Sequence, residues 1–376
     1  MSVYILFSTS WSAQNGGINA INYDLASALN ANAQEIFAIV SDATDSDISD
    51  AARLGVQLRV ASSDYSNLHN WLPALLEDLR PSLNGECLWI GHDTITGGAA
   101  LLARNIVGGK FVLFHHMDYA NYYHLKKKNG EEKISSQKSL LKQADVVFGV
   151  GPRLFANAKR LRLSAKQTYL FEPGRPSFAI AASKEFDRRI AICGRLSASE
   201  DPVKNLSASI RAAVSSINNE GNRGALTLIG AEYGSARNII GKNLPAIAVN
   251  EISYIGNREN YFSELIDNNI VMMPSVKEGF GLVGWEALCL GIPLVLSRSC
   301  GLYEWLKANN LSEYVVSVEM TGIAPFDEMA LKGALSALIG NYKDHKSRAL
   351  ELANSSKIKT WNETAIHFAS LLSSEV

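Results

Sequence analysis

Two glutamates stand eight positions apart in the segment PSVKEGFGLVGWEAL, residues 274–288, among glycines and large apolar residues. An ionised carboxylate accepts hydrogen bonds at both oxygens, so Glu278 and Glu286 could each hold a pair of neighbouring hydroxyls. Gly279 and Gly281 lack a Cβ and let the backbone approach a ligand closely. The pattern indicates recognition of a polyhydroxylated ligand. The alternative is that Glu278 caps a helix and Glu286 is solvated.

A second segment, ICGRLSASEDPVKNL at residues 192–206, carries two cations after an apolar run. Arg195 follows the predicted strand end at Gly194, and Lys204 precedes a predicted helix. A guanidinium fork and an ammonium point charge beside a helix start suit a diphosphate, because helix N-termini and both cations favour negative charge. The alternative is that both are ordinary surface cations.

The N-terminal half offers weaker candidates after its predicted strands. Gly16 and Gly17 open a predicted helix in SAQNGGINAINYDLASALN, but the segment is not GxGxxG, and a plain tight turn explains it equally well. Two more strand ends carry titratable side chains, namely His92, Asp93, His115, His116 and Asp118. Alternation along a strand lets only one of the two adjacent histidines face a ligand, and the sequence leaves that choice open. The HxxxH spacing of a helical zinc site is absent, which disfavours a metal.

Composition limits the class of protein. The chain has 376 residues, 47% hydrophobic and 19% charged, which predicts two packed domains. Its formal net charge of −1 argues against nucleic-acid binding that depends on a large excess of positive charge. The only run of like charge, HLKKKNG at 124–130, is interpreted as a solvated helix end. The four cysteines form no CxxC pair, so neither a disulfide framework nor a zinc site is indicated.

The N-terminus has no basic region before its short apolar run, so we interpret it as a strand and not as a signal peptide. No stretch approaches the roughly 20 apolar residues of a membrane-spanning helix. The sequence therefore predicts a cytoplasmic protein and leaves a peripheral membrane contact open.

Short apolar runs alternate with longer amphipathic stretches, the pattern of parallel sheets covered by helices. We predict strands at 3–8, 35–40, 87–91, 110–115, 145–150, 190–194, 225–230, 252–256, 269–275, 292–297 and 314–318. Amphipathic helices are predicted between the strands of both halves, for example at 18–30, 67–79, 95–106 and 132–143, with a last helical stretch at about 359–373 and a linker at 171–189. Ligands of open α/β sheets bind at the carboxyl ends of the strands, where every candidate above is expected to lie.

Taken together and in this order, these segments resemble the GT-B fold glycosyltransferases, specifically the retaining family 4. PSVKEGFGLVGWEA matches the E-x7-E signature of that family from Glu278 to Glu286. GRL…KN matches its Arg/Lys pair, with SASEDPV lengthening the usual interval. NEISYIGNRENYFSELIDNNIVMMPS is similar to the stretch that cups the nucleotide base, and WNETAIHFASLL to the last helix.

The resemblance implies an α/β GT-B architecture of two facing Rossmann-like parallel-sheet domains with a cleft between them. It implies an acceptor-side domain over 1–175, a donor nucleotide-sugar domain over 186–355, and a C-terminal helix over 356–376 that crosses back to the first domain. The expected activity is transfer of a sugar from a nucleotide-diphosphate sugar, of UDP or GDP type, to a hydroxyl of a saccharide, lipid-linked or small-molecule acceptor. Neither a cofactor nor a metal is expected.

The resemblance also assigns roles to residues. Catalytic roles are implied for His115, His116, Arg195, Lys204 and Glu278. Donor contacts are implied for Gly16, Gly17, Arg195, Lys204, Tyr254, Ile255, Glu278, Gly279, Phe280, Gly281, Leu282 and Glu286. His92, Asp93 and Asp118 are expected on the acceptor side.

Because no candidate nucleophile stands out, front-side attack is the expected course of this hexosyltransferase-type reaction. The alternatives are a catalytically silent sugar-nucleotide-binding protein, a sugar-nucleotide epimerase or a phosphorylase of the same architecture. A nicotinamide dehydrogenase is disfavoured by the missing glycine fingerprint.

Overall fold

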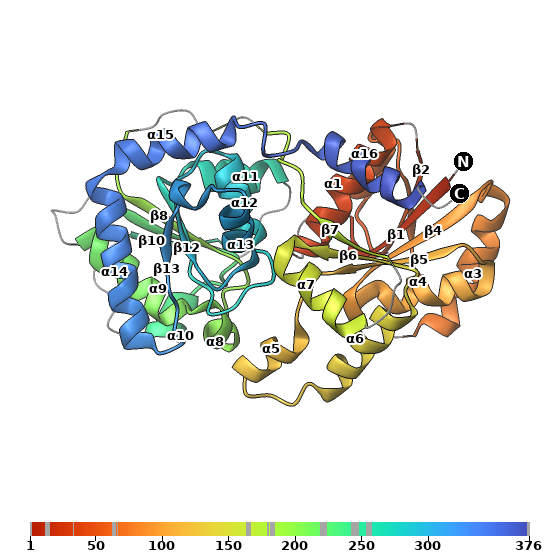
Figure 1. Ribbon diagram of the computed structural model, residues 1–376, viewed down its shortest axis with the longest axis horizontal. Coiled ribbons are helices and arrows are strands. Elements are labelled where there is room, and N and C mark those ends of the chain that lie inside the picture. Colours follow the sequence, from red (N-terminus) through yellow and green to blue (C-terminus); the bar gives the residue numbers. More distant parts are fainter. Residues whose placement is uncertain are drawn as a thin grey trace. The chain divides into compact units, whose positions relative to one another are not determined.

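A computed structural model shows a chain divided into two compact units. Unit 1 comprises residues 1–120, 130–174 and 359–376, and unit 2 comprises 121–129 and 175–358. The structure describes residues 2–11, 16–32, 34–61, 65, 67–162, 167–178, 180, 185–218, 224–241, 248–252 and 258–373. Each unit is a Rossmann-like parallel sheet with helices on its faces (Figure 1), which confirms the predicted fold class.

The sheet of unit 1 has seven strands, all parallel, in the order β3-β2-β1-β4-β5-β6-β7. They are β1 (Ser2–Ser10), β2 (Glu35–Asp42), β3 (Gln57–Val60), β4 (Glu86–His92), β5 (Lys110–His115), β6 (Val146–Val150) and β7 (Thr168–Phe171). The strand order reverses between β1 and β4, so the loops after these two strands border the switch point where such sheets bind ligands.

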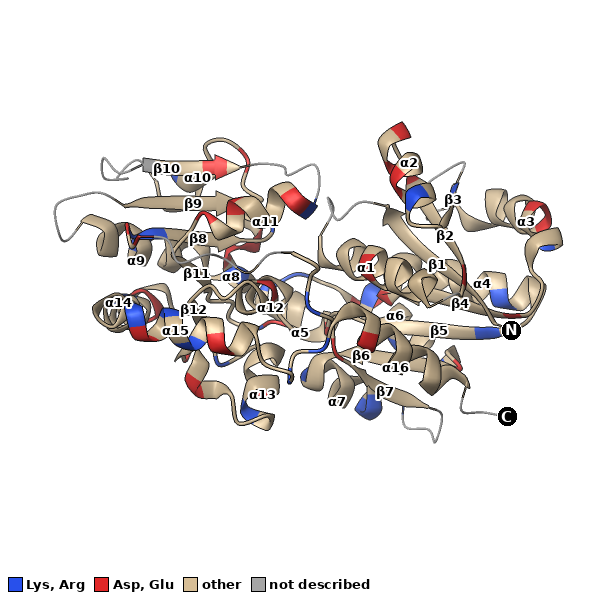
Figure 2. Cartoon of the chain, turned by 90° about the horizontal axis from the view of Figure 1, so that it is seen from above, with Lys and Arg blue, Asp and Glu red and all other residues tan. Residues whose placement is uncertain are grey.

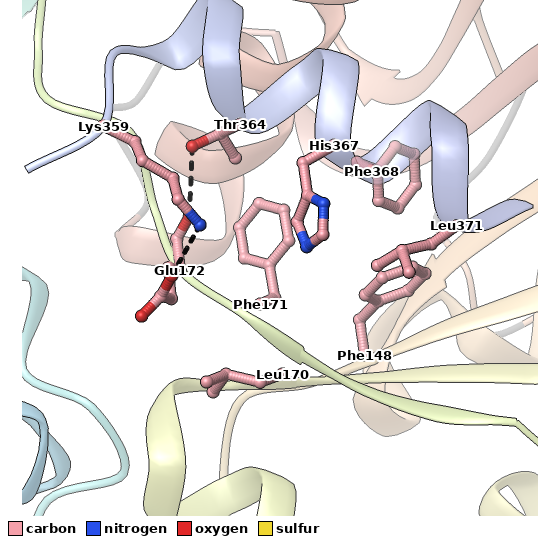
Figure 3. Close-up of a pocket in the computed structure, with 9 residues that line it drawn as sticks. All are labelled: Phe148, Leu170, Phe171, Glu172, Lys359, Thr364, His367, Phe368 and Leu371. Carbon is pink, nitrogen blue, oxygen red and sulfur yellow. Dashed lines mark hydrogen bonds and ion pairs between the residues drawn. The ribbon is translucent and has the colours of Figure 1, made fainter. Parts of the chain in front are cut away.

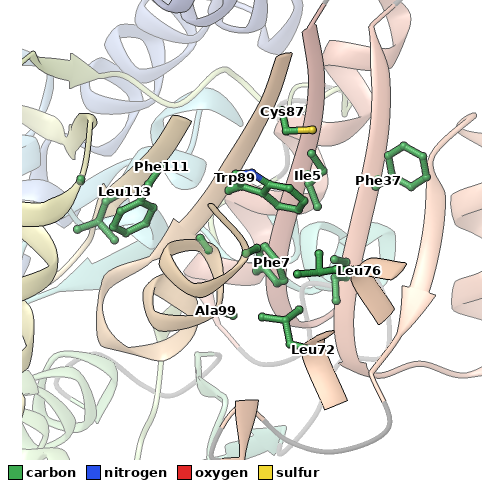
Figure 4. Close-up of a cluster of buried hydrophobic side chains, with 14 of the residues drawn as sticks. Ile5, Phe7, Phe37, Leu72, Leu76, Cys87, Trp89, Ala99, Phe111 and Leu113 are labelled. Carbon is green, nitrogen blue, oxygen red and sulfur yellow. The ribbon is translucent and has the colours of Figure 1, made fainter. Parts of the chain in front are cut away.

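The helices of unit 1 cover this sheet and close its core. They are α1 (Gly17–Ala31), α2 (Asp45–Arg53), α3 (Leu68–Leu79), α4 (Asp93–Val107), α5 (Tyr119–Leu125), which runs into the segment assigned to unit 2, α6 (Glu131–Gln143), α7 (Gly151–Arg162) and α16 (Trp361–Ser373). On one face Phe7, Trp89 and Phe111 from the strands pack with Leu72 and Ala99 from the helices (Figure 4). The strands are apolar along their length because both faces of the sheet are buried.

Helix α16 belongs to unit 1 although it ends the chain. Phe368 is 1% exposed, and its ring centroid lies 4.7 Å from that of Phe148 and 5.6 Å from that of Phe114. At the start of the helix, Lys359 pairs with Glu172 at 2.8 Å (Figure 3). The cavity left between this helix and the sheet measures about 10 Å³, so it is a packing defect with room for no substrate.

The sheet of unit 2 has six parallel strands in the order β10-β9-β8-β11-β12-β13. They are β8 (Arg189–Cys193), β9 (Ala225–Ile229), β10 (Ala248–Ile252), β11 (Ile270–Met273), β12 (Leu294–Ser297) and β13 (Val316–Val318). This order repeats that of the first six strands of unit 1. Its switch point lies between β8 and β11, the strands that precede the Arg/Lys segment and the E-x7-E segment.

The helices of unit 2 are α8 (Asp201–Lys204), α9 (Leu206–Asn218), α10 (Ser235–Ile240), α11 (Arg258–Ile266), α12 (Leu282–Cys289), α13 (Gly301–Ala308), α14 (Ala324–Gly340) and α15 (Tyr342–Ala353). In both units, acidic residues, lysines and arginines are confined to helices, loops, strand ends and the outer strands β3 and β10 (Figure 2). A charge in the interior of a sheet would be buried on both faces at a high desolvation cost.

One predicted strand differs from the described strand in position, and other elements were missed. The strand predicted at 252–256 lies at Ala248–Ile252, and residues 253–257 are outside the described part. Two short outer strands, β3 and β7, and helix α2 have no counterpart among the predictions. No helix within the described ranges is both long and apolar enough to cross a bilayer.

Candidate functional site

The switch point of unit 2 brings the two predicted donor segments together. β8 and β11 are neighbours in register, so the chain after Cys193 and the chain after Met273 emerge side by side. The side chain of Lys204 forms an ion pair with Glu278. The lengthened interval between Arg195 and Lys204 folds as a 3-10 turn at Ala198–Glu200 followed by α8. The inserted residues therefore form a compact turn that places Lys204 beside the Glu278 carboxylate.

The Lys204–Glu278 pair is partly shielded from water, with side-chain exposures of 22% and 23%. Burial alone raises the pKa of Glu278, but the ammonium of Lys204 and a hydrogen bond from Ser275 Oγ at 3.3 Å outweigh it and lower that pKa. Glu278 is therefore ionised at neutral pH. It does not cap α12, because that helix begins after Gly281 without a side-chain cap.

The glycine loop before α12 is held in a shape that excludes side chains. Gly281 has φ +103°, and a Cβ there would lie 2.9 Å from Met273 Sδ. The carbonyl of Phe280 accepts a hydrogen bond from Leu302 N at 2.7 Å, which braces the loop. Across the described ranges no acceptor faces the amide N–H groups of Phe280 and Gly281. These donors, near the N-terminus of α12, can bind sugar or phosphate oxygens.

Glu286 lies in the middle of α12 and is buried, with 6% of its surface exposed. Arg258 Nη1 donates to its Oε1 at 2.8 Å, and Tyr261 Oη donates to its Oε2 at 2.8 Å. Both partners lie on α11, one helical turn apart. They were missed at the sequence level, although their i, i+3 spacing in NRENYF was a usable signal. Each carboxylate oxygen keeps a second lone pair for a ligand hydroxyl.

Arg195 follows Gly194, whose φ is +136°, and its side chain is exposed. Burial alone raises the pKa of the nearby Glu200, but hydrogen bonds from Lys126 and Tyr122, followed by the charge of Arg195, leave it lowered. Glu200 is 6% exposed, and its Oε1 accepts from Tyr122 Oη and Lys126 Nζ, each at 2.8 Å. Sequence reasoning missed this cluster because the partners are more than 70 positions apart.

The interpretation of HLKKKNG as a solvated helix end is wrong for one of its lysines. The side chain of Lys126 is 9% exposed and pairs with Glu200, whereas Lys127 and Lys128 are exposed. The free-energy cost of burying the Lys126 ammonium is offset by the Glu200 carboxylate and the Tyr122 hydroxyl. Counting charges along the sequence around Lys126 does not reveal these partners.

In unit 1 the glycine turn after β1 and the segment with His92 and Asp93 after β4 also border the switch point, and the segment with His115 and His116 lies at the end of the neighbouring strand β5. Gly16 has φ +104° and precedes α1, and both Gly16 and Gly17 are exposed. β4 ends at His92, and Asp93 opens α4 in the left-handed region with φ +43°. β5 ends at His115.

His115 is fully buried and has both ring nitrogens engaged. Nδ1 lies 3.0 Å from Asp93 Oδ1 and Nε2 lies 2.9 Å from Asn157 Oδ1. Asn157 Nδ2 donates to Asp118 Oδ2 at 2.9 Å, which orients the amide oxygen toward His115. Both nitrogens therefore carry protons. Burial alone lowers the pKa of His115, but these partners, Asp93 foremost, leave it raised.

His116 is placed differently from its neighbour. It follows the strand, and its backbone N–H donates to Asp93 Oδ2 at 3.0 Å. Its ring Nε2 lies 2.8 Å from His92 Nδ1, and the rings of His116 and Phe114 are stacked. The residue is partly exposed, and its ring Nδ1 has no partner in the described part of the chain. Of the two adjacent histidines, only His116 thus has a ring nitrogen open to a ligand.

Two predicted donor residues, Tyr254 and Ile255, lie in 253–257, outside the described residues. In the remainder, no group of three or more His, Cys, Asp or Glu side chains is arranged to hold a metal ion.

The geometry agrees with what comparisons of sequence and structure find. A family model described as "Family 4 Glycosyltransferase in conflict systems" matches residues 5–368. No curated protein matches the chain by sequence.

Solved structures show the same fold at low sequence identity. Sucrose-phosphate synthase from Thermosynechococcus elongatus is 18% identical, with a TM-score of 0.76 over 99% of this chain and 98% of that one. Anabaena HepE, solved in complex with UDP and glucose, is 15% identical with a TM-score of 0.72 over 100% of both chains. WaaG, a glycosyltransferase of lipopolysaccharide biosynthesis, is 11% identical with a TM-score of 0.69 over 99% of this chain and 100% of that one.

Proposed function

The chain belongs to the family 4 glycosyltransferases of conflict systems, and on that premise we propose that it transfers a sugar from a nucleotide-diphosphate sugar to an acceptor hydroxyl with retention of configuration. The observation that carries the proposal is the Lys204–Glu278 ion pair at the switch point of unit 2. It joins the two sequence segments that were predicted separately for the diphosphate and for the sugar.

Each donor group has a physical counterpart in unit 2. Arg195 and Lys204 neutralise the diphosphate, and their effect grows as the glycosidic bond breaks and negative charge moves onto the leaving group. Glu278 and the amides of Phe280 and Gly281 bind hydroxyls of the transferred sugar. Glu286 binds the ribose hydroxyls while Arg258 and Tyr261 hold its carboxylate in place.

Binding of the donor requires one internal contact to change. Lys204 is now paired with Glu278, and a diphosphate would compete for the ammonium while sugar hydroxyls replace it on the carboxylate. The partial exposure of both side chains keeps the cost of this exchange low, since ion pairs near the surface are weak.

Retention is proposed to follow front-side attack, with a donor phosphate oxygen taking the proton of the acceptor hydroxyl. The leaving group is stabilised by cations of the chain, so the reaction is proposed to proceed without a metal ion. UDP-sugars are the first donors to test, because HepE was solved with UDP and glucose and a trehalose-6-phosphate enzyme with UDP-2-fluoro glucose. The acceptor is proposed to be a saccharide or glycoconjugate.

The test is a panel of UDP- and GDP-sugars with candidate saccharide acceptors, with release of free nucleotide diphosphate as the readout and parallel reactions in EDTA. Lys204→Ala should lower transfer by roughly 100-fold or more. The matched control is Lys307→Ala, an exposed lysine of α13 in the same unit, which should leave the rate unchanged.

Other outcomes would assign a different function. Thermal stabilisation by a nucleotide sugar without nucleotide release, across all acceptors, would identify a silent binding protein. Conversion of the donor sugar without release would identify an epimerase. Equal rates for the two lysine variants would refute the assigned role of Lys204.

A further inference from the structure

His92 lies at the end of β4 and is 0% exposed, and it contacts His116, the one of the two adjacent histidines that has an open ring nitrogen. On the basis of the proposed sugar transfer, we infer that His92 is a positioning residue. It sets the tautomer of His116 so that Nδ1 of His116 accepts a hydrogen bond from a hydroxyl of the sugar substrate. The inference follows from a chain of hydrogen bonds in which each proton has one permitted place.

The chain of bonds begins at a backbone carbonyl, which can only accept. Ser8 Oγ donates to the carbonyl of Ser10 at 3.0 Å. The hydroxyl proton of Ser8 is thereby used, so its oxygen accepts the contact at 3.0 Å from Asn22, which must present its Nδ2. The carboxamide oxygen of Asn22 therefore faces the opposite way, toward His92 Nε2 at 3.0 Å.

The next link assigns the protons of His92. An oxygen acceptor at Nε2 requires the proton of His92 to lie on that nitrogen. Burial lowers the pKa of His92 to about 3, so the ring is neutral and Nδ1 carries a lone pair. The 2.8 Å contact between His92 Nδ1 and His116 Nε2 needs one proton between the two nitrogens. That proton must come from His116.

His116 is thereby left with a lone pair on Nδ1. Burial foremost, with the neighbouring imidazoles of His92 and His115, lowers the pKa of His116 well below its ordinary value, so the ring stays neutral. The neighbouring His115 donates from both nitrogens and cannot accept a hydrogen bond. A sugar hydroxyl can therefore donate to the lone pair on Nδ1 of His116, whereas a protonated Nδ1 could only donate to the hydroxyl oxygen and would reverse the bond.

Two substitutions of His92 test its hydrogen bonds to His116 and to Asn22 separately. In Asn, Oδ1 is two bonds from Cβ, as is Nδ1 of histidine, so His92→Asn keeps an acceptor for His116. In Gln, the terminal amide nitrogen is three bonds from Cβ, as is Nε2, so His92→Gln keeps the contact with Asn22 but loses the acceptor. The two variants are matched in polarity and differ in the bond that the inference requires.

The experiment is a histidine-ring ¹⁵N NMR spectrum of the wild type and both variants, beside kcat and KM for sugar transfer. The His116 signal is assigned by its loss in His116→Phe. We expect Nε2–H at His116 in the wild type and in His92→Asn, and a population with Nδ1–H in His92→Gln. Transfer should fall about tenfold in His92→Gln and stay within about threefold of wild type in His92→Asn, the range of one hydrogen bond.

The possible results distinguish this inference from the proposed function. An Nδ1–H signal at His116 in the wild type, read without any turnover, overturns the tautomer assignment even if neither variant folds. Equal losses of transfer in the two variants overturn the positioning role of His92. Absence of nucleotide release by the wild type would instead refute the proposed function, and with it the sugar hydroxyl as the partner of Nδ1.

Discussion

The buried ion pair between Arg258 and Glu286 allows a quantitative test of how the Glu286 carboxylate is held. The two side chains are 15% and 8% exposed, and their closest atoms are 2.8 Å apart. With charge centres at about 4 Å and an effective dielectric constant near 20, the attraction is roughly 4 kcal/mol. Arg258→Met keeps the side-chain length but leaves a buried carboxylate with one partner fewer. We expect it to lower local stability by about 3 kcal/mol.

A double-mutant cycle isolates this interaction from other losses. Arg258 also lies over the ring of Phe262 at 4.7 Å, and that contact is lost whether or not Glu286 is charged, so it cancels in the cycle. Glu286→Gln removes the charge that needs a partner. The double variant should therefore be more stable than the sum of the two single effects predicts, with a coupling energy of about 2 kcal/mol.

The assay should report on α11 and α12 alone, because a chain of two units need not unfold in a single step. Hydrogen exchange of peptides covering 258–266 and 282–289, followed over a urea series, gives the free energy of opening of these helices. Arg237→Met, at an exposed arginine of α10, is the matched control and should change it by less than about 0.5 kcal/mol. A coupling energy below about 0.5 kcal/mol would refute the reasoning.

Three further predictions concern other parts of the chain. Phe368→Ala should destabilise the docking of α16 by about 3–5 kcal/mol, since it empties the centre of an aromatic cluster, and faster hydrogen exchange of 361–373 would show it. The pKa of Glu278 lies below its ordinary 4.5. The ionised Glu278 therefore contributes its full stabilisation above pH 4.5, and this contribution is lost as the pH falls through the lower pKa of Glu278 in the folded state. In a series of thermal-unfolding measurements at decreasing pH, Glu278→Gln should not show this loss. Gly281→Ala should cost at least about 1 kcal/mol in urea unfolding, because its φ is positive and its Cβ would crowd Met273. Gly333→Ala, at an open helical position, should stabilise by up to about 1 kcal/mol, and equal effects at both glycines would contradict the strain argument.

Elements with strong local signals were predicted well from the sequence. The buried strands β5 and β6 read as unbroken apolar runs because both faces of a parallel sheet are covered. Elements without such a signal were missed. β3 is a four-residue outer strand, QLRV, that is only partly buried. Helix α2 begins with a capping box of Thr44 and Asp47, but it has one buried residue, Ala51, and therefore no apolar face that a sequence pattern could reveal.

For the candidate site, the sequence located the candidate side chains along the chain but did not identify their partners. It located Lys204, Glu278 and Glu286 after the correct strands, since a strand followed by glycines and charges is a local pattern. It could not show that Glu286 meets Arg258, because that contact depends on how α11 packs beside α12. The insertion between Arg195 and Lys204 likewise became interpretable only once it was seen to fold as a turn and a short helix.

The amino-acid sequence by itself determined the parallel α/β architecture of two units and the strand ends at which polar groups gather, because side-chain periodicity and turn residues act over a few positions. Tertiary structure alone decided which of two adjacent histidines keeps an open nitrogen. Proton positions in His92 and His116 depend on Asn22, which is 70 residues from His92 in the chain. Such long-range hydrogen bonds form only when strand order brings distant segments to the same edge of a sheet.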